Sequence, residues 1–330
     1  MKNLYPPVKP RTSWCFPVTD GYKLYYELVG NPKGIPTVFL HGGPGAGFEK
    51  DDRRFFNPKK FNVLLFDQRG SGKSKPFAST KNNTTQKLIQ DIQVLTRHFF
   101  GDRKVFVFGG SWGSTLALAY SLACPKNVLG ILLRAVFLAN SEDNADFFGG
   151  GTRLQYPDVW ERFIGNVPPT KRKNWRTIIA FFETKFRSKK ASVRKKFSSE
   201  WSRFEMSMLK VNYDPKGIEK KCREKRTLAL AALEAHYIGK LCFMPDNYLI
   251  DNAHKLSSIP ATIVHGRHDK ICRPINAWRV HKAIKGSKLV FVNSAHSAHD
   301  ENMERQLREE MDIFAKKLSR ASQLSPLLSA

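Results

Sequence analysis

The sequence predicts an α/β protein with a mostly parallel, doubly wound sheet that is interrupted once by a helical insertion. Two observations predict it. Short apolar runs bounded by Gly, Asp or Asn alternate with helical patterns, which is typical of strands buried on both faces. Residues 138–248 break that alternation and look helical. We therefore expect a first core part over residues 1–137, a helical cap over 138–248 and a second core part over 249–330.

The first core part is expected to open with a hairpin and to continue as strands and a helix. Residues 22–29 alternate like a strand and follow a turn at residues 19–21. Apolar residues at helical spacing predict a helix over residues 88–99, with Thr84 and Thr85 as candidate N-caps. Buried strands are expected at residues 37–40, 63–66, 105–108 and 129–133.

The cap and the second core part complete the pattern. The cap is expected to contain helices at residues 175–186, 201–209 and 227–241. In the second core part we expect strands at residues 261–265 and 289–292 and a helix near 277–284. A final amphipathic helix is indicated by Leu307, Met311, Phe314 and Leu318.

Composition is ordinary for a soluble globular protein, with 41% hydrophobic and 25% charged residues in 330. No run of 18 apolar residues exists, and no apolar stretch follows the N-terminus, so we expect neither a membrane span nor a signal peptide. The five scattered cysteines suit free thiols rather than disulfides or a zinc site. These observations predict a cytoplasmic protein.

The net charge of +26 is unusual, and the cap carries much of it. Residues 151–250 hold 22 Lys and Arg against 10 Asp and Glu. A nucleic acid or a membrane surface is a partner to consider for such a chain, but no nucleic-acid-binding motif accompanies the charge. We therefore interpret the charge as a solvated helical surface and expect neither partner, whereas a homo-oligomer is compatible with the sequence.

The segment Gly109-Gly110-Ser111-Trp112-Gly113 carries the strongest chemical signal. It matches G-x-S-x-G and lies between a predicted strand and a helical run, where a nucleophile elbow is expected. The glycines permit a tight turn that presents the Ser111 hydroxyl, and the helix N-terminus directs N–H groups at developing negative charge. This context predicts an α/β-hydrolase fold with Ser111 as nucleophile.

The acid and the base should follow Ser111 in the chain, in that order. The strand at 261–265 runs into Gly266-Arg-His-Asp269, which makes Asp269 the expected acid. The last strand runs into Asn293-Ser-Ala-His296, which makes His296 the expected base. His299 is the weaker alternative, because it is expected to lie in the first turn of the succeeding segment.

Two backbone N–H groups should stabilise the oxyanion. Trp112 follows the nucleophile, and Gly43 lies in the Gly-rich loop His41-Gly-Gly-Pro-Gly45 after an early strand. The segment Gly70-Ser-Gly-Lys-Ser74 resembles part of a phosphate-binding loop, but Asp67 stands where that motif needs glycine. We therefore expect no bound nucleotide. We also expect no other cofactor and no metal.

With these residues in place, the chain resembles the proline iminopeptidases of the α/β-hydrolase type. The resemblance runs from Leu4-Tyr-Pro-Pro7 nearly to the C-terminus. The segments that carry it include His41-Gly-Gly-Pro-Gly45, Asp67-Gln-Arg-Gly-Ser-Gly-Lys-Ser74, Asn83-Thr-Thr85, the elbow, Pro157-Asp-Val-Trp-Glu161 and Gly266-Arg-His-Asp269. It implies a serine exopeptidase that releases proline from the N-termini of peptides, with Ser111, Asp269 and His296 as its triad.

The resemblance also implies a set of substrate-binding residues. Glu205 and Glu234 would hold the charged imino terminus, Phe137 and Phe148 would form the proline pocket, and Arg134 would lie near the substrate. Physics supports Glu234 independently. It follows an apolar helical run, where an unpaired buried carboxylate is costly and calls for a cation. A nearby Arg or Lys is the alternative partner for it.

The chain departs from the family pattern at four positions near these residues. Phe204 replaces Trp, Ala235 replaces Asn, Ile238 replaces Phe and Ala295 replaces Gly. These changes leave the expected chemistry intact but affect pocket shape. Two other functions stay open: an esterase or amidase for small acyl substrates, and a basic binding protein without catalysis.

Overall fold

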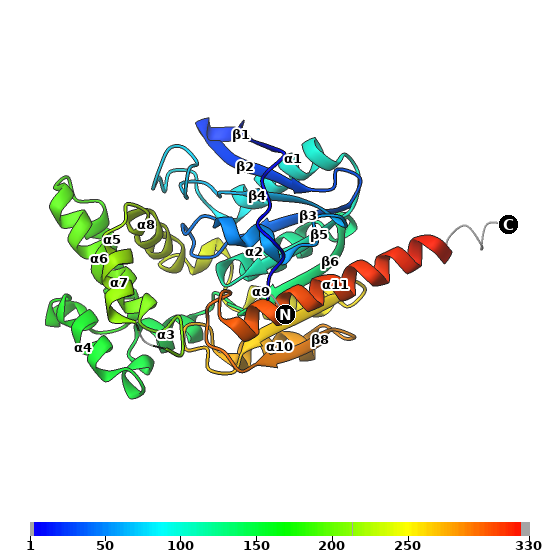
Figure 1. The fold of residues 1–330 in the computed structure, drawn as a ribbon. Coiled ribbons are helices and arrows are strands. Elements are labelled where there is room, and N and C mark those ends of the chain that lie inside the picture. The colour runs from blue at the N-terminus through cyan, green and yellow to red at the C-terminus, as the bar shows by residue number, and fades with distance from the viewer. Residues whose placement is uncertain (1–2, 213, 325–330) are drawn as a thin grey trace.

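The computed structural model describes residues 3–212 and 214–324. Over these residues it contains one eight-stranded sheet in the order β1-β2-β4-β3-β5-β6-β7-β8 (Figure 1). β1 and β2 pair antiparallel, as do β2 and β4, and the other neighbours are parallel. The prediction of a mostly parallel sheet that opens with a hairpin is therefore confirmed.

All strands expected from the sequence are present, most of them one or two residues longer than expected. The longer strands reflect backbone pairing that continues beyond the apolar run, as at Gly109 and Gly110. The strands are β1 (Thr12–Pro17), β2 (Lys23–Gly30), β3 (Ile35–Leu40), β4 (Phe61–Phe66), β5 (Val105–Gly110), β6 (Val128–Arg134), β7 (Ala261–Gly266) and β8 (Lys288–Val292).

Helices cover both faces of the sheet. On one face, α1 (Thr85–Phe100), α2 (Trp112–Ala123) and α10 (Pro274–Ala283) share an apolar cluster with the strands, beside the short α9 (Tyr248–Asn252). On the other face, α11 (Glu301–Leu324) contributes residues such as Met303, Leu307 and Met311 to a second cluster. The side chain of Thr84 accepts a hydrogen bond from the Lys87 amide at 3.3 Å, so Thr84 is the N-cap of α1.

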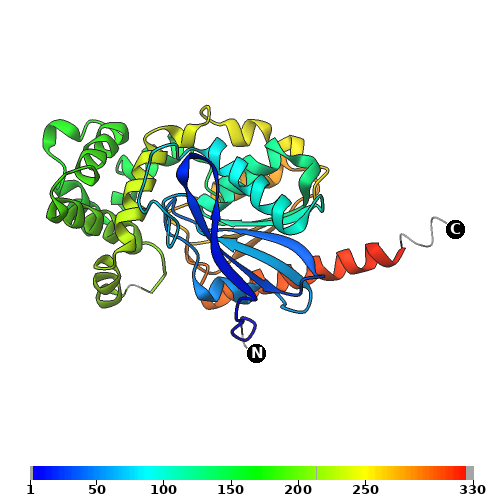
Figure 2. The same cartoon turned by 90° about the horizontal axis from the view of Figure 1, so that it is seen from above.

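The helices α3 to α8 form the cap between β6 and α9, and all of them except α7 contribute to an apolar cluster of their own. Figures 1 and 2 show them as a green group at one end of the sheet. Their bounds are α3 (Ser141–Phe148), α4 (Pro157–Gly165), α5 (Trp175–Phe186), α6 (Ala191–Met206), α7 (Pro215–Cys222) and α8 (Arg226–Ile238).

The cap helices differ from expectation in extent. The helix predicted at 201–209 begins ten residues earlier and ends at Met206. Its first half was not predicted because that half is charged and shows little apolar periodicity. The helix expected at 227–241 ends at Ile238, and a 3-10 turn follows at Leu241–Phe243. The short helices α3, α4 and α7 were not predicted. Within the described ranges, no helix is both long enough and apolar enough to cross a bilayer.

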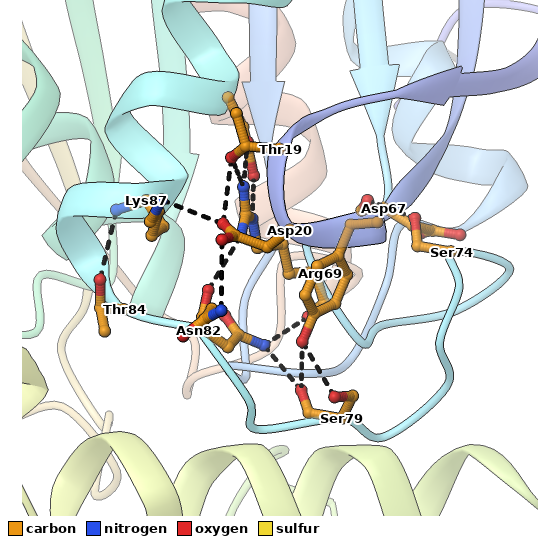
Figure 3. Close-up of polar contacts among 12 residues, drawn as sticks. Thr19, Asp20, Asp67, Arg69, Ser74, Ser79, Asn82, Thr84 and Lys87 are labelled. Atoms are coloured by element: carbon orange, nitrogen blue, oxygen red, sulfur yellow. Dashed lines mark hydrogen bonds and ion pairs between the residues drawn. The ribbon is translucent and has the colours of Figure 1, made fainter.

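A buried cation organises the loop that follows β4 (Figure 3). The guanidinium of Arg69 donates to both carboxylate oxygens of Asp91, at 2.6 and 2.8 Å. It also donates to Asp20 at 2.8 Å and to the carbonyl of Asn82 at 2.9 Å. Because Asp20 lies in the β1–β2 turn and Asp91 lies in α1, Arg69 joins three segments that are distant in sequence.

The same loop holds the cap. The Asn83 amide donates to the carbonyl of Arg69 at 3.0 Å, and its oxygen accepts from the Tyr237 hydroxyl at 2.7 Å. A ring nitrogen of His236 lies 2.9 Å from the Asn83 carbonyl oxygen. Tyr237 and His236 both belong to α8, so this helix is fixed to the core at a buried polar junction.

The segment that resembles a phosphate loop wraps around a carboxylate of the protein. Asp67 accepts from the amides of Phe48 and Lys73, at 3.0 and 2.7 Å. A Cβ on Gly72 would lie only 2.2 Å from the Asp67 carboxylate, so glycine is needed there for this close approach. Burial raises the pKa of Asp67 to about 6. The glycines of this segment therefore serve a turn built around Asp67.

Candidate active site

The nucleophile elbow is a sharp turn between β5 and α2. Ser111 has φ 58° and ψ −127°, a conformation that L-residues rarely adopt. The turn is held by a hydrogen bond of 2.9 Å from the Ser111 amide to the carbonyl of Arg134 on β6. A Cβ on Gly109 would lie 2.0 Å from the carbonyl oxygen of Gly113, and one on Gly113 would lie 2.0 Å from that of Leu40. The flanking glycines are therefore steric requirements of the elbow.

The side chains of Ser111, His296 and Asp269 form a continuous hydrogen-bonded chain. Nε2 of His296 lies 3.0 Å from Oγ of Ser111, and Nδ1 lies 3.0 and 2.9 Å from the two carboxylate oxygens of Asp269. All three residues are buried. Because Asp269 can only accept when ionised, Nδ1 carries the proton and Nε2 is free to accept from Ser111.

Asp269 is held as an anion. Burial by itself would raise its pKa, but the charge of His296 and hydrogen bonds to the carboxylate outweigh burial and lower it. Oδ1 also accepts from the amides of Ile271 and Cys272, at 3.0 and 2.9 Å. His265 lies 3.5 Å from the other oxygen and donates to the Cys272 carbonyl at 2.9 Å. The loop after β7 therefore holds the carboxylate of Asp269 in place independently of His296.

His299 occupies a different place. Its ring nitrogens lie 3.3 Å from Asp52 and 3.2 Å from Glu304, and its ring stacks on Phe55 with the centroids 5.6 Å apart. Burial opposes the charged form of His299, but the two carboxylates outweigh it and raise its pKa. Its ring nitrogens therefore bind carboxylates, and no hydrogen bond joins them to Ser111 among the described residues.

The two loops that carry the expected oxyanion donors are braced against each other. Nε2 of His41 accepts from the Gln68 amide at 2.9 Å, so Nδ1 carries the proton and donates to the Gly42 carbonyl at 2.8 Å. The Gln68 side chain donates to the His41 carbonyl at 2.9 Å and accepts from Nε1 of Trp112 at 2.8 Å. Burial lowers the pKa of His41 to about 4, which keeps the ring neutral. Gly43, with φ 105°, borders two cavities that Ser111 also borders.

Two cap carboxyl groups lie next to the elbow. Glu205 from α6 and Glu234 from α8 border one cavity together with Ser111. Glu234 is 4% exposed and accepts from Nε1 of Trp201 at 2.5 Å, and Oε2 of Glu205 is buried without a hydrogen-bond partner among the described residues. Burial raises the pKa of Glu234 well above its usual value, and the nearby Glu205 raises it further. Burial also raises the pKa of Glu205. Such a pair is stabilised by a bound cation.

The cavity beside these carboxyl groups has a volume of about 40 Å³. Phe137 and Phe148 both border it, as the resemblance implied, and so do Phe147 and Ile238. Phe148 stacks on Trp201 with ring centroids 4.9 Å apart, which ties the cavity wall to the indole that binds Glu234. The cavity is therefore small, and three phenyl rings and the two cap carboxyl groups are among the groups that border it.

Arg134 supports the site from below. Its guanidinium donates to the main-chain carbonyl of His296 at 2.6 Å. A Cβ on Gly110 would lie 2.5 Å from the same guanidinium, so Arg134 packs under the elbow. Arg134 also borders a second, larger cavity next to Ser111. This geometry indicates that Arg134 positions His296.

Some site residues were not found by sequence reasoning. His265 belongs to no motif, although it lies near the end of β7 and its Nε2 is 3.5 Å from Asp269. Asn144 borders the small cavity, and its buried amide nitrogen has no hydrogen-bond partner in the described part of the chain; it lies in a helix that was not predicted. Gln68 could have been suspected from its place directly after a buried strand. Cys272, a buried thiol, borders the same cavity.

The departures from the family pattern have separate locations. Phe204 is buried in the cap and stacks on Phe163 with the ring centroids 4.1 Å apart. Ile238 borders the small cavity, and Ala235 belongs to the cap's apolar cluster. Ala295 is buried directly before His296. Of the four, Ile238 is the one that faces the site.

Comparison with known proteins agrees with this geometry. A family model described as alpha/beta hydrolase fold matches residues 36–303. A probable proline iminopeptidase from Leptolyngbya boryana is 39% identical over 316 residues, with 95% of this chain and 97% of that protein covered. A proline iminopeptidase from Arabidopsis thaliana is 39% identical over 311 residues, with 93% and 80% covered.

Solved structures agree on the fold. An esterase from Exiguobacterium antarcticum superposes with a TM-score of 0.63 at 19% identity, covering 92% of this chain and 100% of that one. A putative lipase from Acinetobacter baumannii gives 0.63 at 14% identity, with 96% and 93% covered. The family model and the full-length relatives show that this chain belongs to the α/β hydrolases and, among them, to the proline iminopeptidases.

Proposed function

We propose that this protein is a serine exopeptidase that releases proline from the N-termini of peptides. The observation that carries the proposal is a pair of carboxyl groups, the buried Glu234 and the partly buried Glu205, in the same small cavity as Ser111. An esterase for neutral acyl groups has no use for two such acids, whereas a protonated imino group needs them. The names of the relatives support the same substrate class.

The chemistry follows from the hydrogen-bonded chain. Ser111 Oγ attacks the prolyl carbonyl carbon while His296 Nε2 takes its proton, and the ionised Asp269 stabilises the resulting imidazolium. The amides of Trp112 and Gly43 are our choice of donors to the oxyanion. His296 then gives its proton to the leaving amine. Water hydrolyses the prolyl-enzyme by the same steps in reverse, and proline is released.

The cap carboxylates would limit cleavage to the first peptide bond. A prolyl nitrogen bound between Glu205 and Glu234 lies a fixed number of bonds from its own carbonyl carbon. Only that carbonyl can then reach Ser111, so a proline inside a peptide has no cation to offer and is not positioned. The cation also relieves the repulsion between the two carboxylates, which would strengthen its binding.

The aromatic cavity would select the pyrrolidine ring. Phe137, Phe148 and Ile238 provide apolar walls around a small cavity, which would favour a compact apolar ring. Larger side chains would need the buried phenyl rings to move, which is costly in a close-packed wall.

A panel of three substrates tests the proposal. Proline β-naphthylamide, alanine β-naphthylamide and a p-nitrophenyl ester are compared by kcat/KM, and we expect strong preference for the proline amide. The Ser111→Ala variant is the control for contaminating peptidases. Fast ester hydrolysis without a preference for proline would instead identify an esterase.

We also propose a cytoplasmic location. All five cysteines are free thiols in the structure, and Cys222, Cys242 and Cys272 are buried. Free thiols are ordinary in a reducing compartment. Fractionation of cells that express the tagged protein tests this, and recovery outside the cytoplasm would contradict it.

A further inference from the structure

A second cavity also borders Ser111, and most of its lining differs from that of the small cavity beside Phe137 and Phe148. It has a volume of about 220 Å³. The two cavities share Gly43, Ser111 and Glu205, so the nucleophile lies where they meet. If the small cavity takes the proline ring, as the proposed function requires, the larger one must take the residue on the other side of the scissile bond.

The walls of this leaving-side cavity include both apolar and charged residues. Met206 and Leu209, at the end of α6, and Leu230 of α8 contribute the cap side of the wall. The loop after β8 is joined to this part of the cap, because the Ser297 amide donates to the Leu209 carbonyl at 2.9 Å. The cavity therefore lies between core and cap and is formed by both.

Apart from Glu205, which both cavities share, the acids of this cavity have partners. Glu49 binds Arg226 at 2.7 Å. Asp52 lies 3.3 Å from His299 and accepts from the Glu49 amide at 2.7 Å. These pairs neutralise the negative groups on the leaving side, so neither carboxylate is free to attract a positively charged residue.

Two cations of the cavity have no carboxylate partner among the described residues. Arg134, below the elbow, donates to the His296 carbonyl and forms no ion pair with a carboxylate in the part of the chain that the structure describes. Lys221, on α7, is exposed and borders the cavity, and its ammonium group forms neither a hydrogen bond nor an ion pair with another described residue. Lys221 is therefore an exposed cation of this cavity that is free to meet a carboxylate of the substrate.

We propose that this cavity is the subsite for the residue that follows proline, and that Lys221 makes the enzyme favour a carboxylate on that residue. The carboxylate can come from an Asp or Glu side chain or from the free C-terminus of a dipeptide. The proposal rests on the proposed function, because it takes the proline to lie on the opposite side of Ser111. It assigns one lysine of the basic cap a role in substrate binding.

Matched substrate pairs measure the preference. Pro-Asp-NH₂ against Pro-Asn-NH₂ tests a side-chain carboxylate, and Pro-Ala against Pro-Ala-NH₂ tests a terminal one. Release of proline is followed as kcat/KM at low ionic strength. Because Lys221 is exposed, we expect the charged member of at least one pair to be favoured about two- to fivefold. Added salt should reduce the ratio.

Variants assign the preference to Lys221. Lys221→Ala should bring the ratio near 1, and Lys221→Glu should invert it. Lys220→Glu is the matched control, because Lys220 is the exposed neighbour on the same helix and borders neither cavity. This control should keep the wild-type ratio.

Three results would overturn the proposal. They are wild-type ratios near 1 in both pairs, ratios that Lys221→Glu leaves unchanged, and an equal response to Lys220→Glu, which would indicate the general field of the cap. Turnover of Pro-Asn-NH₂ by the wild type tests the proposed function separately, since that substrate carries no carboxylate. Its absence would defeat the proposed function, whereas its presence with flat ratios would defeat only the subsite.

Discussion

Replacement of Glu234 by Gln is the most informative perturbation of the proposed amine site. Gln has nearly the same shape and can still accept the hydrogen bond that Trp201 donates at 2.5 Å, so the local packing should survive. The variant loses only the negative charge. A hydrogen bond to a charged group is worth about 1.5–3 kcal/mol, which corresponds to a loss of about 10- to 150-fold in kcat/KM for proline amides.

The assay compares a proline amide with a p-nitrophenyl ester that has no amino group. Both reactions need Ser111 and His296, so their ratio isolates the amine site. Glu309→Gln, which neutralises an exposed carboxylate of α11, is the control and should change neither rate. If Glu234→Gln lowers the amide and ester rates equally, the carboxylate serves the structure or the chemistry, and the reasoning about a cation is refuted.

The same ratio has a pH dependence whose sign is fixed by the structure. Burial raises the pKa of Glu205 and Glu234 above the ordinary value of 4.5. The ionised form binds the cation, so the amide-to-ester ratio of the free enzyme should fall as pH is lowered through these raised values. A ratio that stays constant down to pH 4.5 would contradict the burial argument.

Three further predictions concern the triad and the packing. Asp269→Asn should lower kcat by about 10⁴-fold while KM changes little, because the amide cannot hold His296 in the required tautomer. A drop below tenfold in steady-state kinetics would contradict this. Arg69→Met leaves the buried Asp91 without its cation and should lower the free energy of unfolding by about 3–5 kcal/mol in urea titrations. A change below about 1 kcal/mol would show that water or Lys87 replaces the guanidinium. Phe204→Trp forces a larger ring against Phe163 and should cost about 1–3 kcal/mol, measured as a lower Tm. An unchanged Tm would mean that the cap has room for it.

The core could be predicted because each of its elements is dictated locally. Buried parallel strands are apolar throughout, and the elbow glycines are demanded by backbone contacts as short as 2.0 Å for an added Cβ. Ser111, Asp269 and His296 follow the ends of β5, β7 and β8, which sets their order along the chain. Ser111 lies more than a hundred positions before the other two, yet the sheet topology brings the three side chains together.

The cap was harder to predict because packing, not periodicity, defines it. The first half of α6 is charged, and α3, α4 and α7 are nine residues or shorter, so apolar spacing is too weak to show them. His265 and Asn144 carry no motif, and only tertiary contacts place them at the site. Glu205 and Glu234 were located through the family resemblance, since no local pattern links two acids on separate helices.

Because Glu205 and Glu234 lie in the cap, the proposed substrate recognition and the proposed hydrolysis belong to different parts of the molecule. The residues that we propose as the triad belong to the loops at the ends of β5, β7 and β8, whereas the groups that would bind the peptide's N-terminus belong to a segment inserted between β6 and β7. Such an insertion can change while the hydrolytic apparatus stays the same. Exchanging this segment between relatives should therefore transfer preference for the first residue and leave the underlying hydrolysis untouched.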